Sequence, residues 1–321
     1  MRLPPALVLL ACMTAACAGG AERAPASGPI VVFNAGSLAR PLRAALDSFA
    51  AREHIAIAQE NGGSLETARK LTDLHRIPDV IALADYEVFP HILMPGQMTW
   101  YARFARNRMV LAYTPQSRYA SEITGTNWWQ IVQRPGVQTG RSDPNLDPNG
   151  YRTLLVMQLA ERYYHQPGLA SRLLAAAPAR NVRPDEADLV GVLQAGALDY
   201  IWSYESLAQA AGLRWVELPD SIDLGSPADS AFYALAATRV LGRTRADTIT
   251  VRGQPIVYGL SIPLSAPHPG LAERFVRFLF SPDGKRVMRD ARLDVLDAPV
   301  IVGSGAPAGV VAAARGSAPA P

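Results

Sequence analysis

Cysteine is almost absent from this chain of 321 residues, because the two that occur, Cys12 and Cys17, both lie within the first 17 positions. The remainder of the sequence therefore has neither a disulfide nor a thiolate metal site. At 49% hydrophobic residues, a chain of this length buries a large core without such cross-links. The five histidines are scattered without the i, i+4 pairing of many metal sites. We therefore predict no resident metal or cofactor.

Patterns typical of nucleic-acid-binding proteins and of common hydrolases are missing as well. The net charge is only +3 and no basic run with interleaved aromatic residues occurs, so we predict no nucleic-acid partner. Arginines far outnumber lysines, a bias that we attribute to genome composition. No Gly-x-Ser-x-Gly, His-Glu-x-x-His or phosphate-binding-loop pattern is present. The chain is not predicted to be an enzyme, and a secreted hydrolase is kept only as a remote alternative.

Residues 1–17 are typical of the leader of an exported protein. Ala6 to Ala16 is an apolar run too short to span a bilayer, small residues surround Cys17, and no later segment is long and apolar enough to span one. Two alternatives stay open, a lipoprotein with a lipid on Cys17 and a simple cleaved signal. Both predict an exported protein, either free in the periplasm or anchored to the membrane through its lipid. Residues 18–28 are interpreted as a tether.

Strand and helix patterns alternate along the mature chain. Short apolar strands are predicted at residues 30–33, 55–58 and 79–85, and helices at residues 41–52 and 65–74. This alternation is typical of an α/β sheet with parallel strands and crossover helices. The fold class predicted for the whole chain is α/β, with two lobes that each contain a mostly parallel sheet flanked by helices.

The order of the predicted elements places two crossings between the lobes. One lobe is predicted to contain residues 29–107 and 223–302, and the other residues 108–222. Residues 303–321 are rich in Gly, Ala and Pro without periodicity, so they are predicted to form a disordered tail. The mature protein is predicted to be a monomer.

Polar loops follow the first three predicted strands. Gly36 and Ser37 follow the first strand, Gly63 and Ser64 the second, and Asp85 the third. Ligands in α/β sheets bind beyond the carboxyl ends of the strands. Free backbone amides and the positive end of the helix dipole meet there and favour an anion. The two serines are therefore expected either to cap their helices or to donate hydrogen bonds to an anion.

The motif GRSDPNLDPNGYR at residues 140–152 is the most informative stretch of the chain. It precedes a predicted helix at residues 153–164, so its polar loop leads into a helix N-terminus. Asp147 places a negative charge at that position. Asp-Pro-Asn-Gly is also a type I turn signature, so a purely structural interpretation of Asp147 stays open.

Several segments occur in an order that points to one known family. They are AGSL at 35–38, GGS at 62–64, ADY at 84–86, RFARN at 103–107 with VLAYT at 110–114, and DPNGYR at 147–152. This ordered set resembles the archaeal-type tungstate/molybdate-binding proteins, the extracytoplasmic components of ABC importers. YGLSIP at 258–263 with residues 275–284 resembles the last segment of such proteins, so the resemblance covers roughly residues 29–302. It implies a two-lobed periplasmic binding protein of the second type, which binds an oxyanion between its lobes and delivers it to a membrane permease.

The resemblance also implies roles for individual residues. The loops at 36–37 and 63–64 would donate hydrogen bonds to the oxyanion from backbone N–H and serine O–H groups. Asp147 would coordinate the metal atom of the anion, since Mo(VI) and W(VI) accept an extra oxygen ligand and the sulfur of sulfate does not. A carboxylate there would therefore disfavour sulfate. Tyr151 is expected to contact the ligand or to hold the loop in place.

One position departs from the family pattern, because Ser203 stands where the pattern has glutamate. Glu205 lies two residues along the predicted strand 198–205, on the same face. It is interpreted either as a substitute ligand or as an exposed edge charge, and Ser203 as a hydrogen-bond donor to a ligand oxygen. The departure keeps open a binding protein of the same fold for sulfate, phosphate or a small carboxylate. A surface adhesin, which predicts no saturable anion binding, is a further alternative.

Three more residues are expected behind those that touch the ligand, namely Asp85, Arg152 and Tyr204. Arg152 is expected to pair with a carboxylate and to orient it, with Asp147 and Asp143 as the candidate partners.

Overall fold

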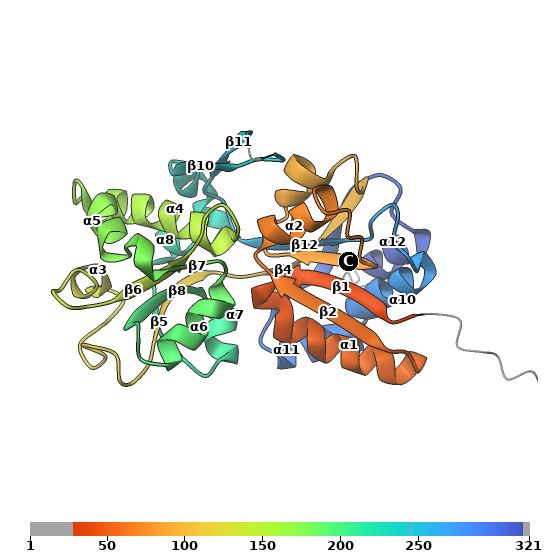
Figure 1. The fold of residues 1–321 in the computed structure, drawn as a ribbon, viewed down its shortest axis with the longest axis horizontal. Coiled ribbons are helices and arrows are strands. Elements are labelled where there is room, and N and C mark those ends of the chain that lie inside the picture. The colour runs from red at the N-terminus through yellow and green to blue at the C-terminus, as the bar shows by residue number, and fades with distance from the viewer. Residues whose placement is uncertain (1–27, 245, 317–321) are drawn as a thin grey trace, which may run out of the picture.

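The computed structural model describes residues 28–244 and 246–316, which form two lobes side by side (Figure 1). The predicted leader with Cys17, the tether up to residue 27 and residues 317–321 lie outside the described residues. Within the described ranges, no helix has the length and apolar character needed to cross a membrane.

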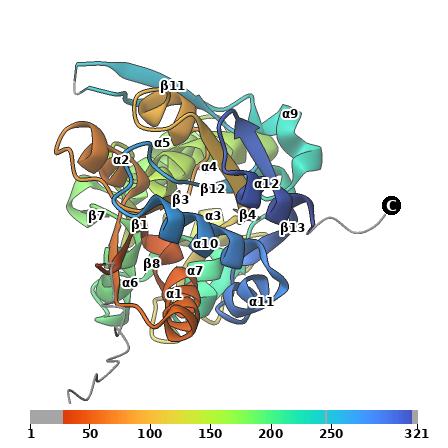
Figure 2. The same ribbon diagram turned by 90° about the vertical axis from the view of Figure 1, so that its right-hand side faces the viewer.

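The larger lobe is built on a six-stranded sheet of order β13-β4-β12-β3-β1-β2. Its strands are β1 (Ile30–Ala35), β2 (Ile57–Gly62), β3 (Val80–Leu83), β4 (Trp100–Arg106), β12 (Val257–Ser261) and β13 (Asp294–Gly303). Its helical elements are η1 (Gly36–Leu38), α1 (Ala39–Glu53), α2 (Ser64–Thr72), η2 (Phe89–Leu93), α10 (Pro269–Phe280), α11 (Pro282–Asp290) and α12 (Ala308–Arg315). Figure 2 looks onto this lobe and shows α1, α10 and α11 packed beside one another.

Burial explains why β1 and β3 are central in this sheet. All four residues of β3 and all but Val31 of β1 are buried, as expected for strands that helices cover on both faces. Strand β1 runs parallel to β2 and to β3, with Ile30 opposite Ile57 and Val32 opposite Val80. The carboxyl ends of these three strands consequently meet at one edge of the sheet, where the polar loops begin.

The smaller lobe is built on a five-stranded sheet of order β7-β6-β8-β5-β9. Its strands are β5 (Met109–Tyr113), β6 (Thr139–Ser142), β7 (Val182–Arg183), β8 (Tyr200–Tyr204) and β9 (Arg214–Glu217). Its helical elements are α3 (Trp128–Ile131), α4 (Pro148–Tyr163), α5 (Leu169–Ala176), η3 (Ala179–Asn181), α6 (Glu186–Gln194) and α7 (Glu205–Ala210). Helix α4 begins five residues earlier than predicted, because Pro148 is well suited to a first helical position and Asp147 caps it.

The chain crosses between the lobes twice. It first crosses at Asn107 and Arg108, between β4 and β5. A following segment then packs along α4; it contains α8 (Asp220–Asp223), η4 (Pro227–Asp229), α9 (Ser230–Tyr233), and the hairpin of β10 (Ala237–Leu241) and β11 (Thr248–Arg252). Gln158 of α4 exchanges two hydrogen bonds with the backbone of Ala237, at 3.0 and 3.1 Å. The hairpin also contacts the larger lobe, since Arg69 of α2 donates to the carbonyl oxygens of Leu241 and Gly242 at 3.0 and 3.3 Å. The segment that follows the boundary predicted at 222–223 thus touches both lobes.

Residues 303–316 are ordered, contrary to the predicted disordered tail. Strand β13 pairs with β4 as far as Gly303, and α12 packs against α10 with Val310 and Ala314 buried. Gly309 faces the long side chains of Glu273 and Arg277 on α10. The small residues that suggested disorder thus lie in a packed helix.

The predicted fold class is confirmed, since two sheets are flanked by helices in two lobes. The sheets are mixed rather than mostly parallel. Strand β12 is antiparallel to β3 and β4, and β5 is antiparallel to β8 and β9. Strand β13 is likewise antiparallel to β4.

Candidate functional site

Helix N-termini from both lobes face one another between the two sheets. The turn η1 and helix α2 come from the larger lobe, and α4 and α6 from the smaller one; each follows a strand. A Cβ atom added to Gly36 would lie 3.5 Å from the Cβ of Ala187, and one added to Gly63 would lie 3.2 Å from the Cβ of Asp147. First-turn N–H groups have no partner within their helix, so this arrangement concentrates donors and positive dipole ends in one place.

The lobes are in direct contact at this place. The backbone N–H groups of Leu65 and Glu66, in the first turn of α2, donate to the carbonyl oxygen of Leu146 at 3.0 and 3.2 Å. A Cβ atom on Gly63 would clash with the same carbonyl group. Only glycine permits this approach of the two backbones, which accounts for one of the glycines that the sequence singled out.

The structure places Ser37 and Ser64 on the larger lobe's side of this junction, both buried. Neither serine caps its helical element, since the capping positions are Ala35 and Gly63 and no side-chain cap bond is formed. Ser37 Oγ accepts a hydrogen bond from the Tyr258 hydroxyl at 2.9 Å, and Ser64 Oγ accepts one from the Ala84 N–H at 2.9 Å. Both oxygens are therefore acceptors in these contacts, and each hydroxyl keeps its own proton to donate.

Asp147 lies across the junction and is 5% exposed. Its Oδ1 accepts a hydrogen bond from the Asn149 N–H at 3.2 Å, and its Oδ2 accepts one from the Glu186 N–H at 2.9 Å. One carboxylate thus joins the N-termini of α4 and α6. Burial raises the pKa of Asp147 to about 7, and Asp185 adds to the rise, although the two N–H groups act in the opposite direction.

Four buried side chains behind this junction connect the lobes. The Tyr151 hydroxyl donates to Asp85 Oδ2, and the Arg152 guanidinium lies 3.3 Å from the same oxygen. Arg152 also donates to the carbonyl of Ala84 at 2.8 Å and to the Tyr204 hydroxyl at 2.7 Å. Arg152 therefore pairs with Asp85 of the other lobe, rather than with either carboxylate expected from the sequence.

Ser203 and Glu205 point in different directions. Ser203 is buried, and its hydroxyl donates to Glu186 Oε1 at 2.6 Å. Strand β8 ends at Tyr204, so Glu205 is the first residue of α7 and does not share a strand face with Ser203 as predicted. The Glu205 carboxylate instead forms a two-point ion pair with Arg108, at 2.7 and 2.8 Å.

Glu186 and Tyr258 belong to the junction, although sequence reasoning did not select them. Glu186 is 2% exposed and Tyr258 is fully buried. Burial raises the pKa of the Tyr258 hydroxyl, and the charge of Glu186 in the opposite lobe raises it further. An available signal was the sequence Pro-Asp-Glu at residues 184–186, which is typical of a helix start. We call Ser37, Ser64, Asp147, Glu186 and Tyr258 together the interlobe site.

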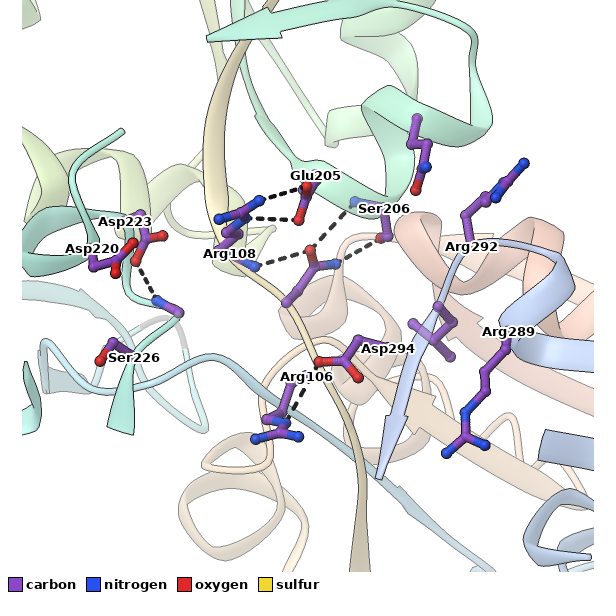
Figure 3. Close-up of a pocket in the computed structure, with 14 residues that line it drawn as sticks. Arg106, Arg108, Glu205, Ser206, Asp220, Asp223, Ser226, Arg289, Arg292 and Asp294 are labelled. Carbon is purple, nitrogen blue, oxygen red and sulfur yellow. Dashed lines mark hydrogen bonds and ion pairs between the residues drawn. The ribbon is translucent and has the colours of Figure 1, made fainter. Parts of the chain in front are cut away.

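A cavity of about 540 Å³ lies at the crossings between the lobes. We call it the hinge groove (Figure 3). It is lined by four arginines and four carboxylates, namely Arg106, Arg108, Arg289, Arg292, Glu205, Asp220, Asp223 and Asp294. Of the residues predicted to bind a ligand, only Glu205 lines it.

Comparison with known proteins places the chain in a family. A model of the bacterial extracellular solute-binding proteins matches residues 30–291. The chain belongs to this family. A solute-binding protein of Petrotoga mobilis without an assigned ligand is 44% identical over 265 residues, which are 82% of this chain and 83% of the relative. The molybdate/tungstate-binding protein WtpA of Thermococcus kodakarensis is 35% identical over 330 residues, 93% of this chain and 92% of the relative. The resemblance predicted from the sequence is confirmed.

Solved structures show the same fold. The periplasmic molybdate-binding protein of Azotobacter vinelandii superposes with a TM-score of 0.58 over 82% of this chain and 98% of its own, at 15% identity. The sulfate-binding protein SubI of Mycobacterium tuberculosis gives a TM-score of 0.57 over 92% and 93%, also at 15% identity. The chain therefore shares its fold with both of these binding proteins, and the fold does not select between their anions. Membership in an extracellular family implies that this solute-binding protein is exported.

Proposed function

We propose that this solute-binding protein captures tungstate or molybdate at the interlobe site and delivers it to the permease of an ABC importer. The observation that carries the proposal is the buried Asp147 carboxylate, held where helix N-termini of both lobes meet. Among the named donors, the hydroxyls of Ser37 and Ser64 remain free to bind anion oxygens. The relative named as molybdate/tungstate-binding supports the same ligand class.

Electrostatics explains why Asp147 favours a metal oxyanion over sulfate. A carboxylate about 4 Å from a dianion is repelled by roughly 8 kcal/mol at an effective dielectric constant near 20, taking ~4 kcal/mol for each pair of unit charges. A central W(VI) or Mo(VI) atom offsets this repulsion by accepting a carboxylate oxygen as an additional ligand. The sulfur of sulfate and the phosphorus of phosphate do not accept such a ligand. Repulsion is therefore left uncompensated for these competitors.

Closure of the lobes would distinguish the liganded protein from the empty one. Glu186, Asp147 and the Arg152–Asp85 pair lie at or across the junction, so their surroundings depend on how the two lobes meet. An anion that bridges both lobes stabilises the closed arrangement by the difference between its affinities for the closed and open forms. The permease would then recognise the closed shape.

Isothermal titration with tungstate, molybdate, sulfate and phosphate at one ionic strength tests this proposal, with wild type and Asp147→Asn compared. We expect one-to-one binding of the two metal oxyanions by wild type, with sulfate and phosphate far weaker. Asp147→Asn should weaken tungstate binding by at least about 1.4 kcal/mol, a factor of ten, because the amide is a poorer metal ligand. The fold should survive, since the amide oxygen still accepts an N–H bond.

Two results would contradict the proposal. Equal affinity of wild type for sulfate and tungstate would indicate a plain hydrogen-bonding site, as in the alternative raised by Ser203. Absence of binding for all four anions would remove the oxyanion function altogether. Asp143→Asn serves as the matched control, because Asp143 lies in the same loop and its carboxylate accepts the Asn145 N–H at 2.8 Å.

A further inference from the structure

Glu186 carries a buried carboxylate oxygen that has no partner in the described structure. Its Oε1 accepts hydrogen bonds from the Ser203 hydroxyl at 2.6 Å and from the Tyr204 N–H at 2.5 Å. Its Oε2 is inaccessible to solvent and has no hydrogen-bond partner. Buried polar atoms are nearly always satisfied in native proteins, so an unsatisfied carboxylate oxygen requires an explanation.

The position of Glu186 indicates what this oxygen faces. Its backbone N–H is bound to Asp147 Oδ2, and its charge acts on the Tyr258 hydroxyl of the opposite lobe. Tyr258 in turn donates to Ser37. The Glu186 carboxylate therefore lies near Asp147 on its own lobe and close enough to Tyr258 on the other lobe to act on it electrostatically, within the interlobe site.

Charge decides which kind of ligand Oε2 accepts. Burial and the negative charge of the neighbouring Asp147 raise the pKa of Glu186 well above its ordinary range. The ionised carboxylates of Asp147 and Glu186 repel each other unless an electron-poor atom lies between them. Among the described residues, no lysine, arginine or histidine forms an ion pair with Glu186 or Asp147, and the nearby Arg152 is paired with Asp85. A cationic side chain thus does not provide the compensation.

We propose that Glu186 is a second carboxylate ligand of the metal atom in the bound oxyanion, opposite or beside Asp147, and that Ser203 orients it. This inference rests on the proposed function and specifies its site. Each carboxylate donates one oxygen lone pair to the electrophilic W(VI) or Mo(VI) centre, whose coordination rises from four oxygens to six. No bond of the anion is broken, and any proton that either carboxyl holds before binding is released to solvent.

The two oxygens of the Glu186 carboxylate have different surroundings and would have different roles. Ser203 and the Tyr204 N–H fix Oε1, which sets the plane of the carboxylate and leaves Oε2 for the ligand. The helix start at Asp185, whose side chain accepts the Asp188 N–H, fixes the backbone of Glu186. The side chain is therefore held before the ligand arrives, so little ordering is needed on binding.

The decisive variant is Glu186→Gln, which keeps the size of the side chain and removes one oxygen ligand. We expect at least tenfold weaker tungstate binding in isothermal titration, with sulfate binding unchanged or stronger because a negative charge is lost. Tungsten L3-edge absorption should show six oxygens around the metal in wild type and fewer in the variant. Asp188→Asn, at an exposed position two residues further along α6, is the matched control and should behave as wild type.

A second variant keeps Glu186 and removes only its support. Ser203→Ala should weaken tungstate binding about threefold or more while leaving sulfate binding unchanged, because Oε1 is no longer fixed by the hydroxyl. Circular dichroism and thermal melting would verify that both variants fold.

Several outcomes would overturn the inference while the proposed function stands. They are tight tungstate binding by Glu186→Gln, a four-oxygen spectrum for tungstate bound to wild type, or equal losses for tungstate and sulfate. The last result would make Glu186 a general support for the site, not a ligand of the metal. Failure of wild type to bind tungstate would instead refute the proposed function, and with it this inference.

Discussion

The interlobe site and the hinge groove are both rich in charged groups, yet they neutralise charge in different ways. In the hinge groove, side chains pair with side chains: Arg108 binds Glu205 through two bonds, and Arg106 lies 3.6 Å from Asp294. In the interlobe site, Asp147 is held by backbone N–H groups. Figure 3 shows the open groove with its opposed charges. A region that is already neutral has little need of a ligand, whereas the interlobe site has carboxylates without a countercharge of their own.

The two regions also differ in how they respond to closure. The groove is partly solvated, so its ion pairs contribute little whether the lobes are open or closed. The interlobe site is buried, so each unpaired group there changes the free energy of closing. Substitutions in the two regions should consequently differ in the size of their effects and in whether they change the affinity for an oxyanion.

The largest effect is expected from Arg152→Met. Closing the lobes would then bury Asp85 without its cation, and breaking a buried ion pair in this way costs about 3 kcal/mol or more. Every oxyanion should lose roughly 100-fold in affinity, because the defect lies in closure and not in ligand coordination. Titration with tungstate and sulfate measures this, and Arg162→Met, at an exposed position on the same helix, is the control. Retention of affinity to within threefold would contradict a role for Arg152 in closure.

A smaller effect is expected from pH on the empty protein. The pKa of Asp147 is raised from 3.8 to about 7, so its protonated form stabilises the buried arrangement fully below about pH 4, and this contribution is lost as the pH rises through 7. The difference is roughly 4 kcal/mol, taking ~3 pKa units at ~1.4 kcal/mol each. Opening the lobes would reduce this cost of burying an ionised Asp147, since Gly63 of the larger lobe lies against Asp147.

Small-angle scattering of the unliganded protein checks this expectation. The radius of gyration should be smaller at pH 5 than at pH 8, and Asp147→Asn should reduce the difference. An identical radius of gyration at both pH values would show that ionised Asp147 does not oppose closure.

The smallest effect is expected in the hinge groove, from Glu205→Gln. The ion pair with Arg108 is about 30% exposed on both sides, so its loss should change the free energy of unfolding by less than about 1 kcal/mol. Tungstate affinity should stay within about twofold of wild type. Thermal melting and titration measure both quantities. A tenfold loss confined to tungstate would restore Glu205 as a ligand and remove the contrast between the two regions.

Sequence reasoning selected three residues of the interlobe site and missed the other two, Glu186 and Tyr258. Loops 36–37 and 63–64 were found because a glycine–serine step between strand and helix has a strong local signature, and Asp147 because Asp-Pro-Asn-Gly has one as well. Their approach across the junction depends on how the two lobes meet, which no local pattern encodes. The ligand roles of these residues remain predictions.

Glu186 was missed for a related physical reason. Acidic residues in the first turn of a helix are common and are usually solvated, so the sequence around Glu186 favours an exposed carboxylate. Its burial comes from Ser203 on β8 and from the opposite lobe. Glu205 was assigned to a strand face because the apolar run of β8 continues up to it, although the strand ends one residue earlier. Residues 303–316 were misjudged because small residues in a packed helix resemble those of a flexible tail.

The contact between Leu146 and the first turn of α2 is made by main-chain atoms alone. Every amino acid except proline supplies the same N–H and C=O groups. This main-chain contact therefore tolerates substitution of the side chains around it, provided that position 63 stays glycine. Under the proposed function, the choice of anion would depend on a few side chains such as those at 147, 186 and 203. A few substitutions would then change the bound anion, while the closed shape that a permease would recognise stays the same.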